Sequence, residues 1–254
     1  MFDLHGKVAL ITGSSRGIGL AIAERMAEFG AKVTISSRKA DACEQAAAKI
    51  AAAGGTALAH AANISERPAL QALVDRTLRE WGRIDILVCN AAVNPHYGPL
   101  ATISDDAFDK IMASNVRSNL WLCNMVIPQM AERRDGAVVV ISSIAGLKGN
   151  KSLGAYGISK AADFELVRNL AVEWGPSNVR VNAIAPAIVR TDFARRLWED
   201  PQIYANAVAR YPLGRIGEPD DVAGTAIFLA SRAGAFVTGQ VVVVDGGVTI
   251  ADAH

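Results

Sequence analysis

Residues 7–19 of the chain read Lys7-Val8-Ala9-Leu10-Ile11-Thr12-Gly13-Ser14-Ser15-Arg16-Gly17-Ile18-Gly19. The stretch begins as an apolar run without helical spacing, which is typical of a buried strand. After the glycines, apolar residues recur at helical spacing through Ile22, Met26 and Phe29 and stop at Gly30. Glycines between a strand and a helix let the backbone approach a phosphate at the positive end of the helix dipole. The spacing G-x-x-x-G-x-G is a variant of the dinucleotide fingerprint and favours nucleotide binding over a structural turn.

Strands and helices alternate along the rest of the chain. We expect strands over Lys7–Thr12, Lys32–Ser37, Thr56–Ala61, Ile84–Cys89, Ala137–Ile141, Val179–Ile184 and Val241–Val244. The expected helices include one from about Pro68 to Trp81, one that starts near Asp105, carries Asn115 and ends near Pro128, and one that carries Tyr156. This alternation predicts a single doubly wound α/β domain of the Rossmann type over residues 1–254, with a mainly parallel seven-stranded sheet and helices on both faces.

Composition excludes several classes of protein. The chain has 254 residues, 51% of them hydrophobic, and a formal net charge of +1, so it has no basic excess that would favour nucleic acid. No apolar run is long enough to cross a membrane, and the opening residues lack the apolar core of a signal peptide. Its three cysteines and four histidines show no metal-ligand spacing, so we expect reduced thiols, no metal and no zinc-dependent chemistry.

The residues after the second expected strand indicate the cofactor. NAD-binding folds usually place a carboxylate there to hold the ribose 2′-hydroxyl, whereas arginine accommodates a 2′-phosphate. Here the chain reads Ser37-Arg38-Lys39, with no carboxylate before Asp41, and Arg16 in the glycine turn adds a second positive charge. The alternative is that both arginines are solvated surface charges, but their joint placement favours NADPH.

Tyr156 and Lys160 are four residues apart at the head of an apolar helix. Side chains at this spacing share one helix face, so the ammonium can lower the pKa of the phenol from its ordinary value of about 10. This makes Tyr156 a candidate general acid or base. An isolated pair of this kind occurs by chance in many helices, but Asn90 and Ser143 follow strand ends that should meet at the same crevice.

These motifs together resemble those of the short-chain dehydrogenase/reductase family, and the match covers nearly the whole chain. The matching segments are Thr12-Gly13-x-x-x-Gly17-x-Gly19, Asn90-Ala91, Ser143 with Tyr156 and Lys160, Thr238-Gly239-Gln240 and Asp245-Gly246-Gly247. The resemblance implies a catalytic tetrad of Asn115, Ser143, Tyr156 and Lys160. It also implies cofactor binding by Gly13, Ser15, Arg16, Gly17, Ile18, Gly19, Ser37, Arg38, Asn63, Ile64, Asn90, Tyr156, Lys160, Pro186, Ile188 and Thr191.

The resemblance also assigns roles to the tetrad. Tyr156 would donate a proton to the substrate carbonyl oxygen while NADPH delivers hydride to its carbon, with the reverse in alcohol oxidation. Ser143 would hydrogen-bond that oxygen, and Lys160 would contact the nicotinamide ribose. Asn115 would hold a backbone and water link through which the proton is replaced from solvent.

Three residues depart from the usual family pattern. Asn63 stands where an aspartate is usual, and Ala92 and Ala187 stand where glycines are usual. Ala187 carries the larger expected cost, because a residue other than glycine is restricted at positive φ. The predicted effect is weaker cofactor binding or a slightly altered nicotinamide position.

Within the family, Ser36-Ser37-Arg38-Lys39 and Asn90-Ala91-Ala92-Val93-Asn94-Pro95 look most similar to NADPH-dependent carbonyl reductases, including animal peroxisomal retinal and dicarbonyl reductases. The chain ends without a peroxisomal address, so we expect a cytoplasmic protein. A 3-oxoacyl thioester reductase is the rival enzyme, and a non-catalytic NADP-binding protein is the rival from another class. Relatives of this type also lead us to expect a homotetramer acting on a small-molecule carbonyl or alcohol.

The segment from Thr191 to Leu213 is long enough to be a lid. Its apolar residues could close a wall over the nicotinamide, which would favour aryl ketones and vicinal dicarbonyls. Alternatively, they only pack the lid against the body of the protein or a neighbouring subunit. The residues concerned are Phe193, Leu197, Trp198, Ile203, Tyr204 and Tyr211.

Overall fold

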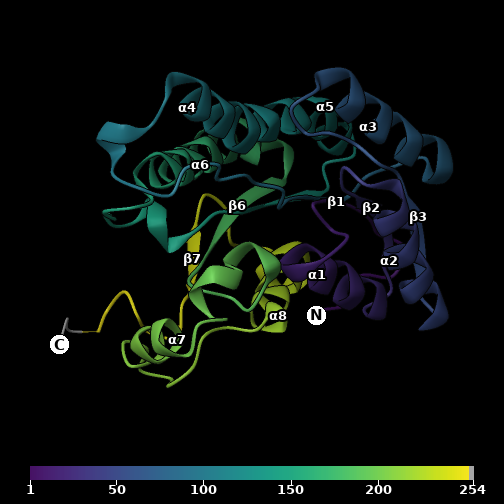
Figure 1. The fold of residues 1–254 in the computed structure, drawn as a ribbon. Coiled ribbons are helices and arrows are strands. Elements are labelled where there is room, and N and C mark those ends of the chain that lie inside the picture. Colours follow the sequence, from purple (N-terminus) through teal and green to yellow (C-terminus); the bar gives the residue numbers. More distant parts are fainter. Residues whose placement is uncertain (252–254) are drawn as a thin grey trace.

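The computed structural model describes residues 1–251 and contains one seven-stranded parallel sheet (Figure 1). The strand order is β3-β2-β1-β4-β5-β6-β7, and every neighbouring pair is parallel. The C-terminal residues 252–254, which entered the expectation about a peroxisomal address, lie outside the described residues. The strands are β1 (Val8–Thr12), β2 (Lys32–Ser36), β3 (Thr56–Ala59), β4 (Ile86–Cys89), β5 (Gly136–Ile141), β6 (Val179–Pro186) and β7 (Val241–Val244).

Helices cover both faces of this sheet (Figure 1). On one face α1, α2 and α8 form an apolar cluster with residues of β1, β2, β4, β5 and β6. On the other face α3, α5 and α6 form a second cluster with residues of β1, β4, β5 and β6. The predicted doubly wound Rossmann-type fold is therefore confirmed, with an entirely parallel sheet. The α-helices are α1 (Gly17–Glu28), α2 (Ala40–Ala52), α3 (Arg67–Trp81), α4 (Asp105–Met112), α5 (Ser118–Glu132), α6 (Gly154–Trp174), α7 (Pro201–Val208) and α8 (Pro219–Ala230).

The order of the strands fixes where a ligand can bind. The chain runs outward from β1 through β2 to β3, then returns to place β4 on the other side of β1. At such a switch point the loops after the two central strands diverge and leave a crevice at their carboxyl ends. The glycine turn after β1 and Asn90 after β4 both lie at this position.

Several predicted boundaries were wrong by a few residues. β4 begins at Ile86 because Asp85 is used as a side-chain anchor, accepting a hydrogen bond from the Val8 backbone N–H at 2.9 Å. The single helix expected from Asp105 is divided by a π-helical turn, η2 (Ala113–Arg117), and Pro128 lies inside α5. β6 extends two residues beyond the prediction, to Pro186, because it continues to pair with β7 there.

Short helical turns connect several of these elements. They are η1 (Leu100–Thr102), η3 (Ile144–Gly146), η4 (Gly175–Ser177), η5 (Asp192–Leu197) and η6 (Arg232–Gly234). Within residues 1–251, no helix combines the length and hydropathy needed to cross a bilayer.

Candidate active site

The turn after β1 has the backbone shape that a phosphate cradle requires. Gly13 and Gly17 have φ angles of +64° and +60°, a region that side chains disfavour. A Cβ atom at Gly17 would lie 3.2 Å from Cγ2 of Thr191, so this part of the turn has no room for a side chain. The first turn of α1 contains no acidic residue, which leaves its N-terminal dipole free to attract an anion. The turn therefore fits a dinucleotide pyrophosphate.

Asn90 braces this turn from the neighbouring strand. Its Nδ2 donates to the carbonyl oxygens of Thr12 and Gly13 at 2.9 and 3.0 Å. A Cβ atom at Gly19 would lie only 2.5 Å from the same nitrogen. The predicted cofactor ligand Asn90 thus has both amide hydrogens directed at the glycine turn, and its observed contacts fix the shape of that turn.

Ser14, which we did not predict, performs a similar task toward β2. Its buried hydroxyl donates to the carbonyl oxygen of Ile11 at 2.6 Å and accepts from the N–H of Ser36 at 2.9 Å. The hydroxyl therefore ties the turn to the end of β2, where the adenosine end of a dinucleotide would lie. The sequence signal was a serine immediately after the first glycine.

The residues expected at the adenosine end occupy the carboxyl ends of β2 and β3. Arg38 is exposed directly after Ser37, whose N–H donates to Sγ of Cys43. Asn63 uses its carboxamide within its own turn, accepting from Ser65 and donating to Glu66 at 2.7 Å. Ile64 packs against the core beside α3. Arg38 is thus positioned at the rim of the site, while Asn63 mainly shapes the loop.

Arg16 forms an ion pair that the sequence did not suggest. Its Nη1 lies 3.0 Å from Oδ2 of Asp192, at the start of η5. Both side chains are exposed, so the free energy of this pair is small, about 0–1 kcal/mol. Ser15 and Ile18 flank Arg16 and are partly buried in the turn. The ion pair joins the glycine turn to the predicted lid.

Tyr156 and Ser143 are brought together by close packing of η3 on α6. A Cβ atom at Gly157 would lie 2.8 Å from the carbonyl oxygen of Ala145, and one at Gly146 would lie 2.7 Å from the N–H of Ala161. Ser143 is the N-cap of η3, and its hydroxyl lies close enough to the Tyr156 phenol to lower the pKa of that group. The two glycines, which sequence analysis missed, allow the approach that pairs these hydroxyl groups.

Burial has the largest effect on the phenol of Tyr156 and raises its pKa above the ordinary value. The charge of Lys160 lowers the pKa, as expected, and that of Asp163 raises it, while the hydrogen bond with Ser143 lowers it. The net direction is upward. The expected shift toward neutrality is therefore not what the structure gives, because burial and Asp163 outweigh the cation.

Asn115 lies in the π-helical turn η2 and is fully buried. Its Oδ1 accepts from the N–H of Val93 at 2.8 Å, and its Nδ2 donates to the Val93 carbonyl and to Oγ of Ser159, each at 3.0 Å. A π-helical turn often occurs at a functional site. Here the turn holds Asn115 between the loop after β4 and the helix of Tyr156.

Lys160 is almost fully buried, and its ammonium lies 5.7 Å from the centre of the Tyr156 ring. The same Nζ donates to the carbonyl oxygen of Ile141 and to Oδ2 of Asp163, both at 3.0 Å. Burial lowers the pKa of Lys160, but the charges of Asp163 and Tyr156 more than offset this effect, so the net pKa is raised. Lys160 therefore remains a cation in the pair.

The segment after β6 carries the last predicted cofactor residues. Pro186 still pairs with Val244, and the N–H of Ile188 donates to the hydroxyl of Tyr211 at 3.0 Å. In residues 1–251 the only non-glycine residues with a positive φ are Arg134 and Asn178, so Ala187 does not have one. The expected backbone strain at Ala187 is therefore wrong, and its alanine is compatible with the loop.

The lid contacts the site less extensively than predicted. Of its aromatic residues, Phe193 places its ring 6.0 Å from that of Tyr156. The ring centres of Trp198 and Tyr204 instead lie 5.4 and 5.5 Å from the central carbon of the Arg190 guanidinium. Tyr211 is buried beneath the segment. Trp198, Tyr204 and Tyr211 thus contact residues before the lid, as in the alternative that these aromatic residues pack the lid against the body of the protein.

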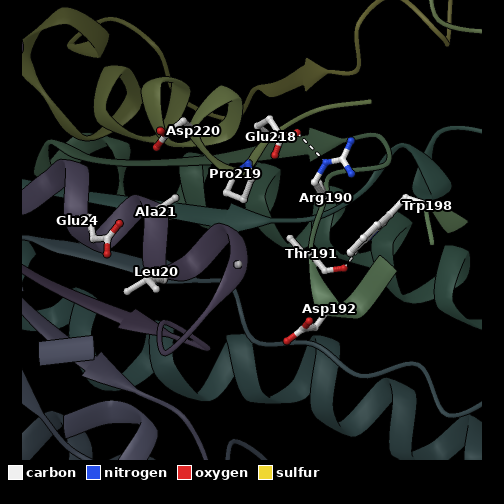
Figure 2. Close-up of a pocket in the computed structure, with 11 residues that line it drawn as sticks. Leu20, Ala21, Glu24, Arg190, Thr191, Asp192, Trp198, Glu218, Pro219 and Asp220 are labelled. Atoms are coloured by element: carbon white, nitrogen blue, oxygen red, sulfur yellow. Dashed lines mark hydrogen bonds and ion pairs between the residues drawn. The ribbon is translucent and has the colours of Figure 1, made fainter. Parts of the chain in front are cut away.

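A cavity of about 640 Å³ lies beyond Thr191, between α1, the base of the lid and the start of α8 (Figure 2). Arg190 reaches across it to Glu218, and the indole N–H of Trp198 donates to the Thr191 carbonyl at 2.9 Å. Most of its charged groups are carboxylates. The cavity borders the glycine turn at Gly17, and Tyr156 is not among the residues that line it.

Comparisons with known proteins agree with this geometry. A family model described as "Enoyl-(Acyl carrier protein) reductase" matches residues 13–249. The chain is 41% identical to "Dehydrogenase/reductase SDR family member 4" of Bos taurus over 244 residues, covering 96% of this chain and 88% of that protein.

Two solved structures show the same similarity. A gluconate 5-dehydrogenase from Burkholderia cenocepacia, in complex with NADP and tartrate, has a TM-score of 0.94 and 33% identity, covering 99% of this chain and 98% of that one. A 7α-hydroxysteroid dehydrogenase with NADH and 7-oxo glycochenodeoxycholic acid has a TM-score of 0.93 and 36% identity, covering 97% and 95%. The chain is therefore a member of the short-chain dehydrogenase/reductase family of oxidoreductases.

Proposed function

We propose that this protein is an NADP-dependent carbonyl reductase that interconverts a ketone or dicarbonyl and the corresponding alcohol. The observation that carries the proposal is the arrangement of Ser143, Tyr156 and Lys160 at the crevice next to the glycine turn. When bound, the nicotinamide supplies or accepts the hydride. Gly13, Gly17 and the N-terminus of α1 would hold its pyrophosphate, and Arg38 would contact the 2′-phosphate.

The chain's own residues supply the proton chemistry. The Tyr156 hydroxyl donates its proton to the carbonyl oxygen during reduction and accepts one during oxidation. The Ser143 hydroxyl hydrogen-bonds the same oxygen and so fixes it near the phenol. Lys160 keeps a positive charge beside the phenol and stabilises the phenolate that forms when the proton leaves.

Two arginines near the ribose position support NADPH over NADH. Arg38 is exposed at the end of β2, and no carboxylate stands at Ser37 or Lys39. The pairing of Arg16 with Asp192 reduces the contribution expected from Arg16, so Arg38 is the stronger candidate. The similar solved structures include one with NADP and one with NADH, so cofactor choice depends on these local charges.

A substrate with an apolar group is favoured by the surroundings of Tyr156. Phe193 is 61% exposed and its ring faces that of Tyr156, so an aryl substituent could pack against it. The second candidate is a 3-oxoacyl thioester reductase. The matching family model is described by an acyl carrier protein substrate, although an enoyl reductase reduces a C=C bond and not a ketone. A non-catalytic NADP-binding protein is disfavoured, because such a protein would not need both the phenol and the buried ammonium.

The test measures loss of NADPH absorbance with purified protein and a panel of ketones, vicinal dicarbonyls, quinones and acyl thioesters. We expect a higher kcat/KM for a phenyl-substituted diketone than for an acetoacetyl thioester. Phe193→Ala should lower the value for the diketone about 10- to 100-fold, since burying an aromatic side chain contributes about 1.5–3 kcal/mol. Phe2→Ala, at an exposed side chain of the N-terminal segment, is the control. A preference for the thioester would support the acyl reductase instead.

Family resemblance also leads us to propose a homotetramer located in the cytoplasm. Exposed apolar side chains support the assembly, with Val172 on α6 80% exposed and Phe236 before β7 fully exposed. The apolar surfaces of such helices and of the C-terminal strand region would be covered by neighbouring subunits.

A further inference from the structure

Asp163 is a buried carboxylate on the same helix as Tyr156 and Lys160, and nothing in the proposed chemistry requires it. Its side chain is 0% exposed. An ionised carboxylate is costly to bury unless it is paired and hydrogen-bonded. Phe164 and Val167 on the same helix are buried in the apolar core beside it, so a leucine or valine would be the ordinary choice at this position.

The carboxylate accepts hydrogen bonds from two helices, α6 and α5. Oδ2 accepts from Nζ of Lys160 at 3.0 Å, and Oδ1 accepts from Nδ2 of Asn119 on α5 at 3.1 Å. The hydroxyl of Ser142, at the end of β5, donates to the backbone carbonyl of Lys160 at 2.8 Å. This set of donors holds the carboxylate in one position. Its pKa is nevertheless raised, because burial outweighs the hydrogen bonds and the charge of Lys160.

Asp163 also connects Lys160 to the π-helical turn. The Nδ2 of Asn119 that donates to Asp163 also donates to the backbone carbonyl of Asn115 at 2.7 Å. A chain of protein groups therefore runs from the Asn115 carbonyl through Asn119 and Asp163 to Nζ of Lys160. This is the place where the family resemblance had led us to expect a water link.

An ammonium has three N–H donors. In Lys160 one is directed at the Ile141 carbonyl and one at Asp163, which leaves one for the nicotinamide ribose or the phenol oxygen. The two occupied donors restrain Nζ, and the adjacent negative charge cancels much of its field. The role of Asp163 toward the phenol rests on the proposed function, in which Tyr156 is the acid.

We propose that Asp163 is a positioning residue that fixes Lys160 and balances its charge, so that the Tyr156 phenol experiences a weaker positive field than Lys160 alone would produce. The other titratable groups near the pair are the thiols of Cys89 on β4 and Cys123 on α5. The pKa of Cys89 lies well above its ordinary value, mainly through its hydrogen bond with Cys123 and through burial, so this thiol is neutral. The charge balance near Tyr156 is therefore set by Lys160 and Asp163.

The experiment follows Tyr156 directly by the ultraviolet absorbance of tyrosinate. Each protein is titrated together with its Tyr156→Phe counterpart, and the difference between the two curves gives the midpoint of Tyr156. In Asp163→Asn, which keeps the shape but removes the charge, this midpoint should fall by about one pH unit. The acidic limb of kcat/KM for alcohol oxidation should move to lower pH by the same amount.

Asp85→Asn is the matched control, because Asp85 is 2% exposed and paired with Arg83 but stands at the opposite end of β4 from the site. It should destabilise the fold and leave the Tyr156 midpoint unchanged. A purely structural role for Asp163 would likewise lower stability without moving the midpoint.

Asp163→Leu provides a second variant that needs no hydrogen-bond partner, with folding checked by circular dichroism. An unchanged or higher Tyr156 midpoint in either folded variant would overturn the proposal. If the midpoint shifts as expected but no carbonyl substrate is reduced, the proposed function fails and the role of Asp163 stands. If a carbonyl substrate is reduced but the Tyr156 midpoint does not move, the proposed function stands and the role of Asp163 fails.

Discussion

The chemistry of the site depends on the surroundings of two side chains, Tyr156 and Lys160. The phenol is held at a raised pKa by burial, with opposing contributions from the cation and from Asp163. Reduction needs the protonated phenol, and oxidation needs the phenolate. Below its pKa the phenol is ready to donate, so the direction of the shift suits carbonyl reduction at neutral pH.

The pH dependence of the two directions should therefore differ. The kcat/KM for carbonyl reduction should be constant through the neutral range and fall only as the pH rises through the raised pKa of Tyr156. The kcat/KM for alcohol oxidation should rise as the pH rises through the pKa of Tyr156. Steady-state rates with saturating cofactor in both directions would measure this, and a reduction rate that falls between pH 6 and 8 would contradict it.

Tyr156→Phe removes the transferable proton and leaves the ring. Reduction should fall by at least the ~10²–10⁴-fold that general acid catalysis contributes. Binding of NADPH, followed by quenching of tryptophan fluorescence, should survive because the ring and Lys160 remain. Turnover above a tenth of the wild-type value would reject Tyr156 as the acid.

Arg38→Asp places a negative charge at the rim of the site, where it would repel a 2′-phosphate and accept from a 2′-hydroxyl. The ratio of kcat/KM for NADPH to that for NADH should fall about 10- to 100-fold or more, since a charge-assisted hydrogen bond contributes about 1.5–3 kcal/mol. Arg79→Asp, an exposed arginine in the last turn of α3, should leave the ratio unchanged. Equal use of both cofactors by the wild type would refute the role given to Arg38.

At the scale of single elements, the important feature is how closely η3 and the π-helical turn approach α6. Gly146 and Gly157 permit the contact of η3 with α6. In the π-helical turn, Asn115 donates hydrogen bonds to Val93, in the loop after β4, and to Ser159 on α6. The lid is attached separately, through the Arg16–Asp192 ion pair and the contact of Phe193 with Tyr156. The proposed catalytic side chains thus stand on packed elements, while the proposed lid is an exposed segment.

Gly157→Ala tests the packing of η3 on α6. The new Cβ would meet the Ala145 carbonyl at 2.8 Å, so η3 must move and carry Ser143 away from Tyr156. The free energy of unfolding should fall and kcat should drop, although alanine normally favours a helix over glycine by about 1 kcal/mol. Gly224→Ala in α8, where the Cβ would meet nothing within 4 Å, should be neutral or stabilising. Urea unfolding of both variants provides the comparison, and similar behaviour would contradict the packing argument.

For the molecule as a whole, the parallel sheet places the carboxyl ends of β1, β4, β5 and β6 on one side of the molecule. Every proposed catalytic group and most proposed cofactor contacts are found at these strand ends. Two of the exposed apolar side chains are Val172, near the C-terminal end of α6, and Phe236, before β7. An assembly through these surfaces would leave the crevice open to cofactor.

Light scattering at micromolar concentration should therefore give a mass near that of four chains of 26.7 kDa. Val172→Glu should reduce this mass, since a charge would be buried at the subunit contact. Leu213→Glu, at a side chain that is 68% exposed on the lid, serves as the control. A monomeric mass for the wild type would refute the tetramer.

Sequence alone was sufficient for the fold, because the run from Lys7 to Gly19 and the alternation of elements are local patterns that one parallel sheet satisfies. It also proposed Ser143, Tyr156 and Lys160 as site residues from their spacing, which depends on one strand end and one helix. It missed Ser14, Gly146, Asn119 and Asp163, since each acts across contacts between elements distant in the chain. A carboxylate three residues after Lys160 on an otherwise apolar helix face was the available signal for Asp163. Only the tertiary structure decided that Arg16 pairs with Asp192, that Ala187 is unstrained and that most lid aromatics contact Arg190, because charge pairing, φ angles and side-chain contacts depend on neighbours that no local pattern specifies.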